Sequence, residues 1–406
     1  MYNMVYLGRF NLNNLLPELS GQISLTQLQQ EMISLSVFLG YAAGSLLNGY
    51  LADRYGGKRF VILGAAASVA CNVGIGAVGD WRALLLVWIV NGFFQSMIWI
   101  GGMVMLVHWW PARERGKGVG IANFFSGLSH VTAYLLPALL LSLWPGLGLG
   151  AYISVPMSIL TLFLVLFAAL AVEAPEKKGL PPYIEEEAKL AAKEAPLREL
   201  AEKNKLPYAC LLTRKRFLWW CLIALLSSTC RYGLLTWIPY YYREESGQLI
   251  SETFSNITLP LGMAFGTLLV TWVAGTRMFQ NKGLVIVVAA ALCGTLTVIF
   301  PRISEPQIVL TGIFFTGFFL YGINGVLWLY AMDEAGRIFP GTGVGILNCC
   351  AYLGAFLEAF IFPWVIRGAG SSIWIFVAMG AFCIGMVVCG MAVCRKNTVI
   401  EPETRE

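Results

Sequence analysis

The chain has little charge for its length. Only 13% of its 406 residues are charged and only two are histidines, whereas 57% are hydrophobic. A soluble surface needs about a quarter charged residues. The shortage therefore excludes a water-soluble enzyme, a nucleic-acid-binding domain and a secreted disulfide scaffold. It predicts instead that the outer surface of the protein faces the lipid bilayer.

The sequence also has no pattern that would bind a metal or build a catalytic site. Its ten cysteines have no CxxC spacing, and most of them stand inside apolar runs. We expect them to be small packing residues. No Ser/His/Asp set and no pair of carboxylates is visible. We therefore expect no enzymatic activity, no metal ion and no cofactor.

Long apolar runs dominate what is present. About 20 apolar residues are needed to cross a bilayer as a helix, and the runs are too continuous for the alternating strands of a barrel. They predict an all-α integral membrane protein. The twelve predicted spans are residues 1–16, 33–52, 60–79, 83–107, 119–143, 150–172, 217–241, 253–274, 284–301, 307–331, 344–366 and 371–394.

The distribution of basic residues predicts which side of the membrane each loop faces. Loops on the cytoplasmic side are enriched in Lys and Arg. If both termini are cytoplasmic, only Arg82, Arg243, Arg302 and Arg367 fall in outer loops, whereas most of the 28 basic residues fall in inner loops or the tail. We therefore expect a multi-pass protein of the cytoplasmic membrane with both termini inside. Nothing in the sequence indicates an oligomer, and we expect a monomer.

Two matches at nearly one spacing reveal an internal repeat. Arg9 and Arg231 are each followed by a proline eight residues later, and the hexapeptide at 118–123 recurs with one change at 343–348. These matches predict two pseudo-symmetric six-helix halves, related by an axis along the membrane normal.

The repeat also predicts the organisation of the chain. We expect an N-terminal half at 1–172, a charged cytoplasmic linker at 173–216, a C-terminal half at 217–394 and a tail at 395–406.

Three charged residues stand inside spans. An Arg in mid-membrane is costly, so Arg9 and Arg231 must face protein or a watery cavity. As repeat mates they should face each other across the centre, where two guanidiniums repel unless an anion lies between them; phosphate fits such a fork. The alternative is that each Arg binds a helix-end carbonyl. Glu358 is a proton or counter-charge site, or else a hydrogen-bonded packing residue.

A polar stripe in the fifth span adds three candidates for the site. Asn123, Ser126 and His130 follow one another at about one helical turn, so they share a face of the helix. We expect them to line one wall of the central cavity. The alternative for His130 is a local hydrogen bond within the helix bundle.

The loop between the second and third spans carries a family motif. Residues 49–59 read Gly-Tyr-Leu-Ala-Asp-Arg-Tyr-Gly-Gly-Lys-Arg. This segment resembles the signature loop of the major facilitator superfamily. The resemblance implies a cytoplasmic gate formed by Asp53 with Arg54, Lys58 and Arg59. The second-half copy lacks the aspartate, and Gly275 stands near its place, so the gate should be asymmetric.

Within that superfamily the chain resembles the organophosphate:phosphate antiporters, which carry glycerol phosphate and hexose phosphates. The motifs are Tyr2-x3-Tyr6-Leu-x-Arg9-x-Asn11, Arg231-Tyr-Gly233, Trp109-Trp-Pro-x3-Arg115-Gly116, Tyr321-Gly322 and Tyr352-Leu-Gly354. The resemblance covers all twelve spans. It implies that Arg9 and Arg231 are a phosphate-binding pair, and that Tyr2, Tyr6, Tyr321 and Tyr352 line the cavity. Helix packing is the alternative role for these tyrosines.

The chain departs from the family at several ligand positions. Ser45 stands where the carriers usually have a lysine, and Ser126 where they often have a histidine. Ser228 replaces a tyrosine, and Pro260 lies near the place of a carboxylate found in some members. The two arginines are kept, but these changes affect the part of the site that would recognise the organic portion of the ligand.

The predicted function is transport of a phosphorylated or other small organic anion, exchanged for inorganic phosphate by alternating access. One rival is a proton-coupled symporter of a carboxylate or sugar acid, with Glu358 or His130 carrying the proton. Another is a transporter-like sensor of a sugar phosphate.

The start of the first span is short by comparison with its repeat mate. Only eight residues precede Arg9, whereas 14 separate Arg216 from Arg231. Eight helical residues reach about 12 Å, which is less than the bilayer half-thickness of about 15 Å. We therefore expect a natural start upstream of Met1, or else a frayed first helix.

Overall fold

A computed structural model describes residues 1–111, 114–144, 149–181, 195, 197–200, 202–203, 206–245, 249–276 and 281–394. The predicted tail, 395–406, and residues 182–194 of the predicted linker lie outside this part of the chain.

The described residues form twelve long helices, as the apolar runs predict. Their bounds are α1 (Tyr2–Ile23), α2 (Gln27–Tyr55), α3 (Gly57–Gly74), α4 (Trp81–Trp109), α5 (Arg115–Leu143), α6 (Leu149–Leu170), α9 (Lys215–Glu244), α10 (Glu252–Ala274), α11 (Lys282–Ile299), α12 (Pro306–Ala335), α13 (Pro340–Ala369) and α14 (Ile373–Cys394). A short helix, α8 (Tyr208–Leu212), precedes α9. In the described part, eleven helices are long and apolar enough to cross a membrane, and α1, with 22 residues, is also long enough.

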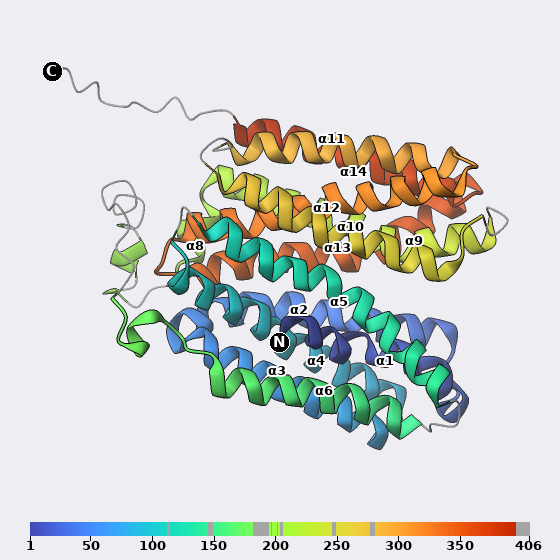
Figure 1. The fold of residues 1–406 in the computed structure, drawn as a ribbon, viewed down its shortest axis with the longest axis horizontal. Helices are drawn as coiled ribbons and strands as arrows, with labels where there is room; N and C mark the ends of the chain where they lie inside the picture. The colour runs from blue at the N-terminus through green and yellow to red at the C-terminus, as the bar shows by residue number, and fades with distance from the viewer. Residues whose placement is uncertain are drawn as a thin grey trace.

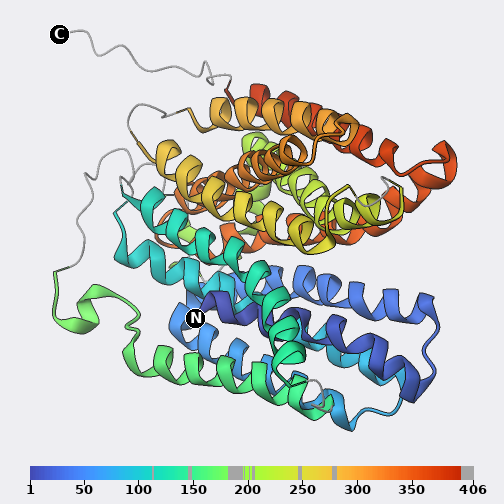
Figure 2. The ribbon, with the colours of Figure 1, turned by 45° about the vertical axis from the view of Figure 1, so that its right-hand side comes forward.

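The helices gather into two groups that can be followed in two views (Figures 1 and 2). Blue to green helices, α1 to α6, form one group, and yellow-green to red helices, α9 to α14, form the other. Packing within the groups matches pair by pair: α2 packs on α4 as α10 packs on α12, and α1 packs on α5 and α6 as α9 packs on α13 and α14. The predicted pseudo-symmetric six-helix halves are confirmed.

The two halves meet along two seams that the same symmetry relates. One seam is α2 against α13, and the other is α5 against α10. Glycines bring the backbones together in both. A Cβ added to Gly49 would lie 2.6 Å from the Gly341 carbonyl oxygen, and one added to Gly116 would lie 2.9 Å from the Gly275 Cα. Because no side chain fits at these distances, the seams depend on glycine.

All the loops at one end of the bundle join the helices α2 to α3, α4 to α5, α10 to α11 and α12 to α13. We call this the basic end, because Arg54, Lys58, Arg59, Lys117 and Lys282 lie there. The other end, where α1 joins α2 and α9 joins α10, is called the opposite end.

Candidate functional site

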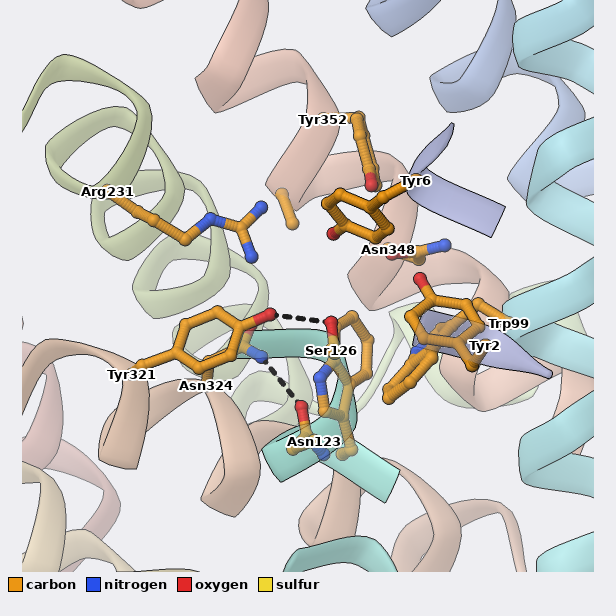
Figure 3. A pocket seen from close by; sticks show the side chains of 12 residues that line it. Tyr2, Tyr6, Trp99, Asn123, Ser126, Arg231, Tyr321, Asn324, Asn348 and Tyr352 are labelled. Carbon is orange, nitrogen blue, oxygen red and sulfur yellow. Dashed lines mark hydrogen bonds between the residues drawn. The ribbon is translucent and has the colours of Figure 1, made fainter. Parts of the chain in front are cut away.

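A small pocket lies between the two halves near the middle of the bundle (Figure 3). Its volume is about 10 Å³, and it is lined by residues of α1, α4, α5, α9, α12 and α13. The lining residues are Tyr2, Tyr6, Trp99, Asn123, Ser126, Arg231, Tyr321, Asn324, Trp328, Asn348, Ala351 and Tyr352. The pocket thus brings together seven of the predicted site residues.

Hydrogen bonds across the pocket join the two halves. The hydroxyls of Ser126 on α5 and Tyr321 on α12 lie 2.9 Å apart, and the Asn324 side chain donates to the Asn123 side-chain oxygen at 3.0 Å (Figure 3). Asn348 donates to the Ser45 hydroxyl at 3.1 Å. The walls of the pocket are therefore polar and are held together from both sides.

Arg231 supplies the positive charge of the pocket. Its side chain is 6% exposed and points from α9 toward Tyr6 and Tyr352 (Figure 3). It donates to the Ser228 hydroxyl at 3.3 Å, and its Nε has no hydrogen-bond partner. The guanidinium carbon lies 4.3 Å from the ring centre of Tyr232. A guanidinium without an anionic partner in a buried pocket can accept an anion at low cost.

Arg9 lies beside this pocket but does not line it. Its Nε donates to the Gln95 side-chain oxygen at 2.8 Å and its Nη1 donates to the Tyr352 hydroxyl at 2.6 Å. Its guanidinium carbon lies 4.4 Å and 4.7 Å from the ring centres of Tyr6 and Tyr41. The Nη2 atom has no partner. Tyr6 and Tyr352 therefore stand between the Arg9 guanidinium and the pocket.

The polar stripe on α5 divides between two environments. Asn123 and Ser126 line the pocket, whereas His130 does not. The His130 ring is fully buried against Tyr6 and Phe10, with ring centres 4.7 Å and 5.7 Å away. Neither ring nitrogen of His130 has a hydrogen-bond partner. The local hydrogen bond considered for this histidine is not seen.

A larger cavity extends from above the pocket to the opposite end. Its volume is about 800 Å³, and its walls come from α1, α2, α5, α9, α10 and α13. Glu358 lines this cavity rather than the central pocket, together with Trp237 and the rim residue Arg243. The halves are therefore apart at the opposite end and joined at the centre.

The predicted gate residue Asp53 lies at the end of α2 and closes the basic end. Its Oδ1 accepts from the Gly341 backbone N–H at 2.6 Å, and its Oδ2 accepts from the Thr342 N–H at 2.7 Å and the Thr342 hydroxyl at 2.8 Å. These groups form the N-terminus of α13, where the helix dipole favours a carboxylate. One side chain of the first half thus binds a helix end of the second.

The three basic residues of the predicted gate differ from Asp53. Arg54 stacks on Tyr55, with its guanidinium carbon 5.8 Å from the ring centre. The Lys58 backbone N–H donates to Glu173 at 2.7 Å. Among the described residues, the side chains of Lys58 and Arg59 take part in no ion pair. These residues surround the gate without crossing it.

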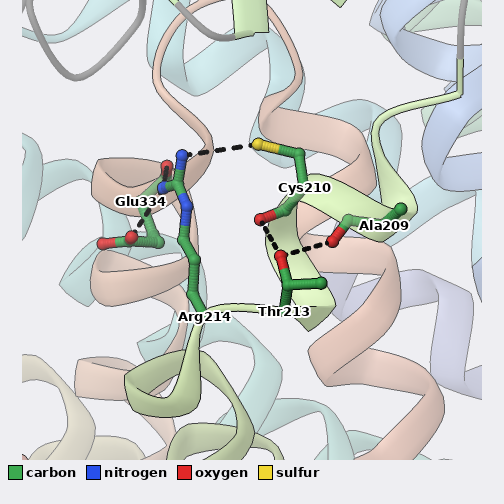
Figure 4. A network of polar contacts seen from close by, with 5 residues as sticks. All are labelled: Ala209, Cys210, Thr213, Arg214 and Glu334. Atoms are coloured by element: carbon green, nitrogen blue, oxygen red, sulfur yellow. Dashed lines mark hydrogen bonds and ion pairs between the residues drawn. The ribbon is translucent and has the colours of Figure 1, made fainter.

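Ion pairs on α12 reinforce the same end. Arg115 of the first half and Lys282 of the second both bind Asp333, at 3.0 Å and 2.5 Å. Arg214, just before α9, binds Glu334 at 2.7 Å (Figure 4). The contact between Arg115 and Asp333 joins the halves, so it adds to the closure by Asp53.

The segment before α9 also reaches the first half at the basic end. The Tyr208 hydroxyl donates to the Leu46 carbonyl of α2 at 2.5 Å. Burial, together with the nearby Asp53 carboxylate, raises the pKa of Tyr208 to about 12. Tyr208 therefore stays protonated and can donate this bond at any physiological pH.

Several pocket residues were not predicted from the sequence. Asn348 is the repeat mate of Asn123, and both line the pocket, so the hexapeptide repeat was a usable signal. Asn324, Trp99 and Trp328 stand in apolar runs without any distinguishing pattern, and nothing in the sequence marked them.

Comparison with known proteins identifies the family. Residues 1–359 match the family model described as Major Facilitator Superfamily. A solved fucose:proton symporter of Escherichia coli has the same fold, with a TM-score of 0.68, 13% identity and 97% of each chain covered.

Curated relatives agree with the motifs. A glycerol-3-phosphate transporter of Bacillus subtilis is 25% identical over 376 residues, covering 89% of this chain and 83% of the relative. A hexose-6-phosphate:phosphate antiporter of Escherichia coli is 25% identical over 361 residues, covering 87% and 78%. A probable sulfoacetate transporter of Cupriavidus necator is 25% identical over 395 residues, covering 94% and 88%. The predicted resemblance to the organophosphate:phosphate antiporters is confirmed.

Proposed function

This chain belongs to the major facilitator superfamily, and we propose that it exchanges a phosphorylated or other small organic anion for inorganic phosphate around Arg9 and Arg231. The basic end faces the cytoplasm in this proposal, because basic loops stay on that side. The named ligands of the relatives, sulfoacetate and phosphate esters, are all anions.

The observation that carries the proposal is the uncompensated charge of the two buried arginines. Arg9 is 1% exposed and Arg231 is 6% exposed. Among the described residues neither makes an ion pair with a carboxylate. Each has a guanidinium nitrogen without any hydrogen-bond partner. Burying two such charges is unfavourable unless a ligand supplies the counter-charge, and a phosphate dianion supplies it to both.

The size of the pocket adds a mechanical requirement. A volume of about 10 Å³ holds at most about one water molecule. A phosphate therefore has to separate the side chains that fill the centre. Tyr352 is the side chain to move, because its hydroxyl occupies Arg9 Nη1. If the phosphate replaces this hydroxyl on Arg9 while it binds Arg231, one ligand ties α1 of the first half to α9 of the second.

The same charges favour exchange over leak. With the site empty, closing both ends would leave two like charges in a low dielectric, where their repulsion is strong. A bound dianion removes that repulsion. The empty protein should therefore return slowly between its two open states, and the loaded one quickly.

Counterflow in proteoliposomes tests the proposal. Vesicles loaded with unlabelled phosphate should take up external labelled phosphate transiently, whereas empty vesicles should not. Arg231→Lys keeps the charge but loses the fork and should reduce the uptake, while Arg82→Lys, at an exposed position, serves as the matched control. Uptake that is independent of internal phosphate would refute exchange.

Proton-coupled symport is a second candidate, favoured by one observation. Glu358 is 5% exposed, and its Oε2 has no hydrogen-bond partner, as expected of a carboxyl group that takes up a proton. An inwardly directed proton gradient should then drive accumulation into vesicles without internal phosphate. Exchange that is unaffected by the gradient would dismiss this candidate.

A further inference from the structure

Glu358 is a buried acid that phosphate exchange does not use. Its Oε2 has no partner, and among the described residues it forms no ion pair. Arg9 is engaged by Gln95 and Tyr352, and Arg231 by Ser228. A buried carboxylate is costly unless a cation compensates it. The described side chains do not supply one.

Arg243 does not fill that role. It lines the same cavity, but its Nε is 2.8 Å from Glu244, and both side chains are about half exposed. The side chains that approach the Glu358 carboxylate belong to Thr236 and Trp237, and Arg243 lies at least six residues further along α9. Six residues correspond to about 9 Å of helix. The cation for Glu358 must therefore come from outside the protein.

Glu358 lies directly above the anion pocket on the same face of α13. Ala351 lines the central pocket and Glu358 lines the larger cavity. Seven residues separate them, which is nearly two full turns and about 10 Å along the axis. A short ligand whose anionic group is held at Arg231 would extend its other end toward Glu358.

The surroundings of Glu358 suit an ammonium group. Trp237 and Tyr240 of α9 line the cavity with it, and so do Phe38 of α2 and Tyr232 of α9, whose ring centres lie 4.8 Å apart. Aromatic faces attract cations, and the attraction grows when water is excluded. A carboxylate beside aromatic rings is thus a better site for an alkylammonium than for a hydroxyl group.

We propose that Glu358 and the aromatic wall bind the ammonium group of a zwitterionic substrate, a short amino-alkyl phosphate or phosphonate whose anionic end binds Arg231. This inference rests on the proposed anion site and specifies its substrate class. It also gives the larger cavity a function in selectivity, because the ligand is read at two points of opposite charge. Plain phosphate uses only the lower point.

A matched pair of ligands tests this directly. O-phosphoethanolamine and 2-hydroxyethyl phosphate have the same length and differ in an ammonium against a hydroxyl. Each is used to inhibit the exchange of labelled phosphate in proteoliposomes, and the ratio of the two inhibition constants is measured. The wild-type protein should prefer the ammonium compound by about tenfold or more, the size of a charge-assisted contact.

Three variants locate the preference. Glu358→Gln should bring the ratio to about one, and Glu358→Asp should retain part of it. Glu31→Gln removes an exposed carboxylate of the same cavity and should leave the ratio as in wild type. Because the ratio compares two ligands in one variant, a general loss of transport activity cancels out.

The outcomes separate this inference from the proposed function. Phosphate exchange with a wild-type ratio near one overturns the inference and leaves exchange intact, as does a ratio that persists in Glu358→Gln. If no phosphate exchange occurs, the proposed function fails. The ratio is then measured as dissociation constants by calorimetry on purified protein, and a preference lost in Glu358→Gln still supports the inference.

Discussion

Replacing Gly49 by alanine should push the halves apart at the basic end. A Cβ at this position would lie 2.6 Å from the Gly341 carbonyl oxygen and 3.2 Å from the Thr342 Cα. Both atoms belong to backbone, so no side chain can turn aside. The α2–α13 seam must widen, which also lengthens the bonds that Asp53 makes to the end of α13.

The expected shift follows from the cost of that clash. Overpacking one methyl group costs about 1–3 kcal/mol. Alanine also gains about 1 kcal/mol of helix propensity, but α2 is helical in both open states, so this gain cancels. The population ratio should therefore move about 5-fold to 150-fold toward the state that is open at the basic end. Gly102→Ala is the control, because its Cβ would meet nothing within 4 Å.

Distances between spin labels measure the shift. Noncanonical amino acids at Arg59 on α3 and Arg216 on α9 avoid the native cysteines, and both positions are exposed near the basic end. The distance distribution should gain a longer component in Gly49→Ala and not in Gly102→Ala. An unchanged distribution in a folded Gly49→Ala protein would show that the seam does not limit opening.

Three further substitutions probe the site and the gate. Arg9→Lys and Arg231→Lys should each reduce phosphate counterflow at least about tenfold, since the planar fork is lost; wild-type rates in either would count against the anion site. Asp53→Asn should change turnover more than affinity, because it weakens closure at one end only, and a pure affinity loss at unchanged label distances would contradict this. His130→Ala should alter the preferred organic ligand more than phosphate self-exchange, as measured by competition; equal loss of both in a folded variant would indicate a packing role.

Apolar run length predicted the number of helices well, and their ends less well. The last predicted segments of α13 and α1 stop at residues 366 and 16, whereas the helices continue to Ala369 and Ile23. Hydropathy reports only the part of a helix that contacts apolar surroundings. Polar turns beyond it are stabilised by backbone hydrogen bonding, so they leave no apolar signal.

Symmetry predicted which residues share the centre, but not where their side chains point. Arg231 reaches the pocket, whereas its mate Arg9 is held aside by Gln95 and Tyr352. A repeat fixes the positions of the Cα atoms approximately. The direction of a long side chain depends on its local partners, and Gln95 has no matching signal in the pattern from which Arg9 was recognised.

The polarity of α1 has a consequence for how the protein is made. This helix carries Arg9 and four asparagines, and one arginine near the centre of a segment already opposes its insertion by the translocon, by about 2.5–3.5 kcal/mol. In the folded protein α1 packs against α5 and α6, and Asn3 donates to a carbonyl of α5 at 3.2 Å. Its stable integration should therefore wait until residues up to about Leu170 have been synthesised, so that the first helix of the chain settles into the bilayer after the sixth.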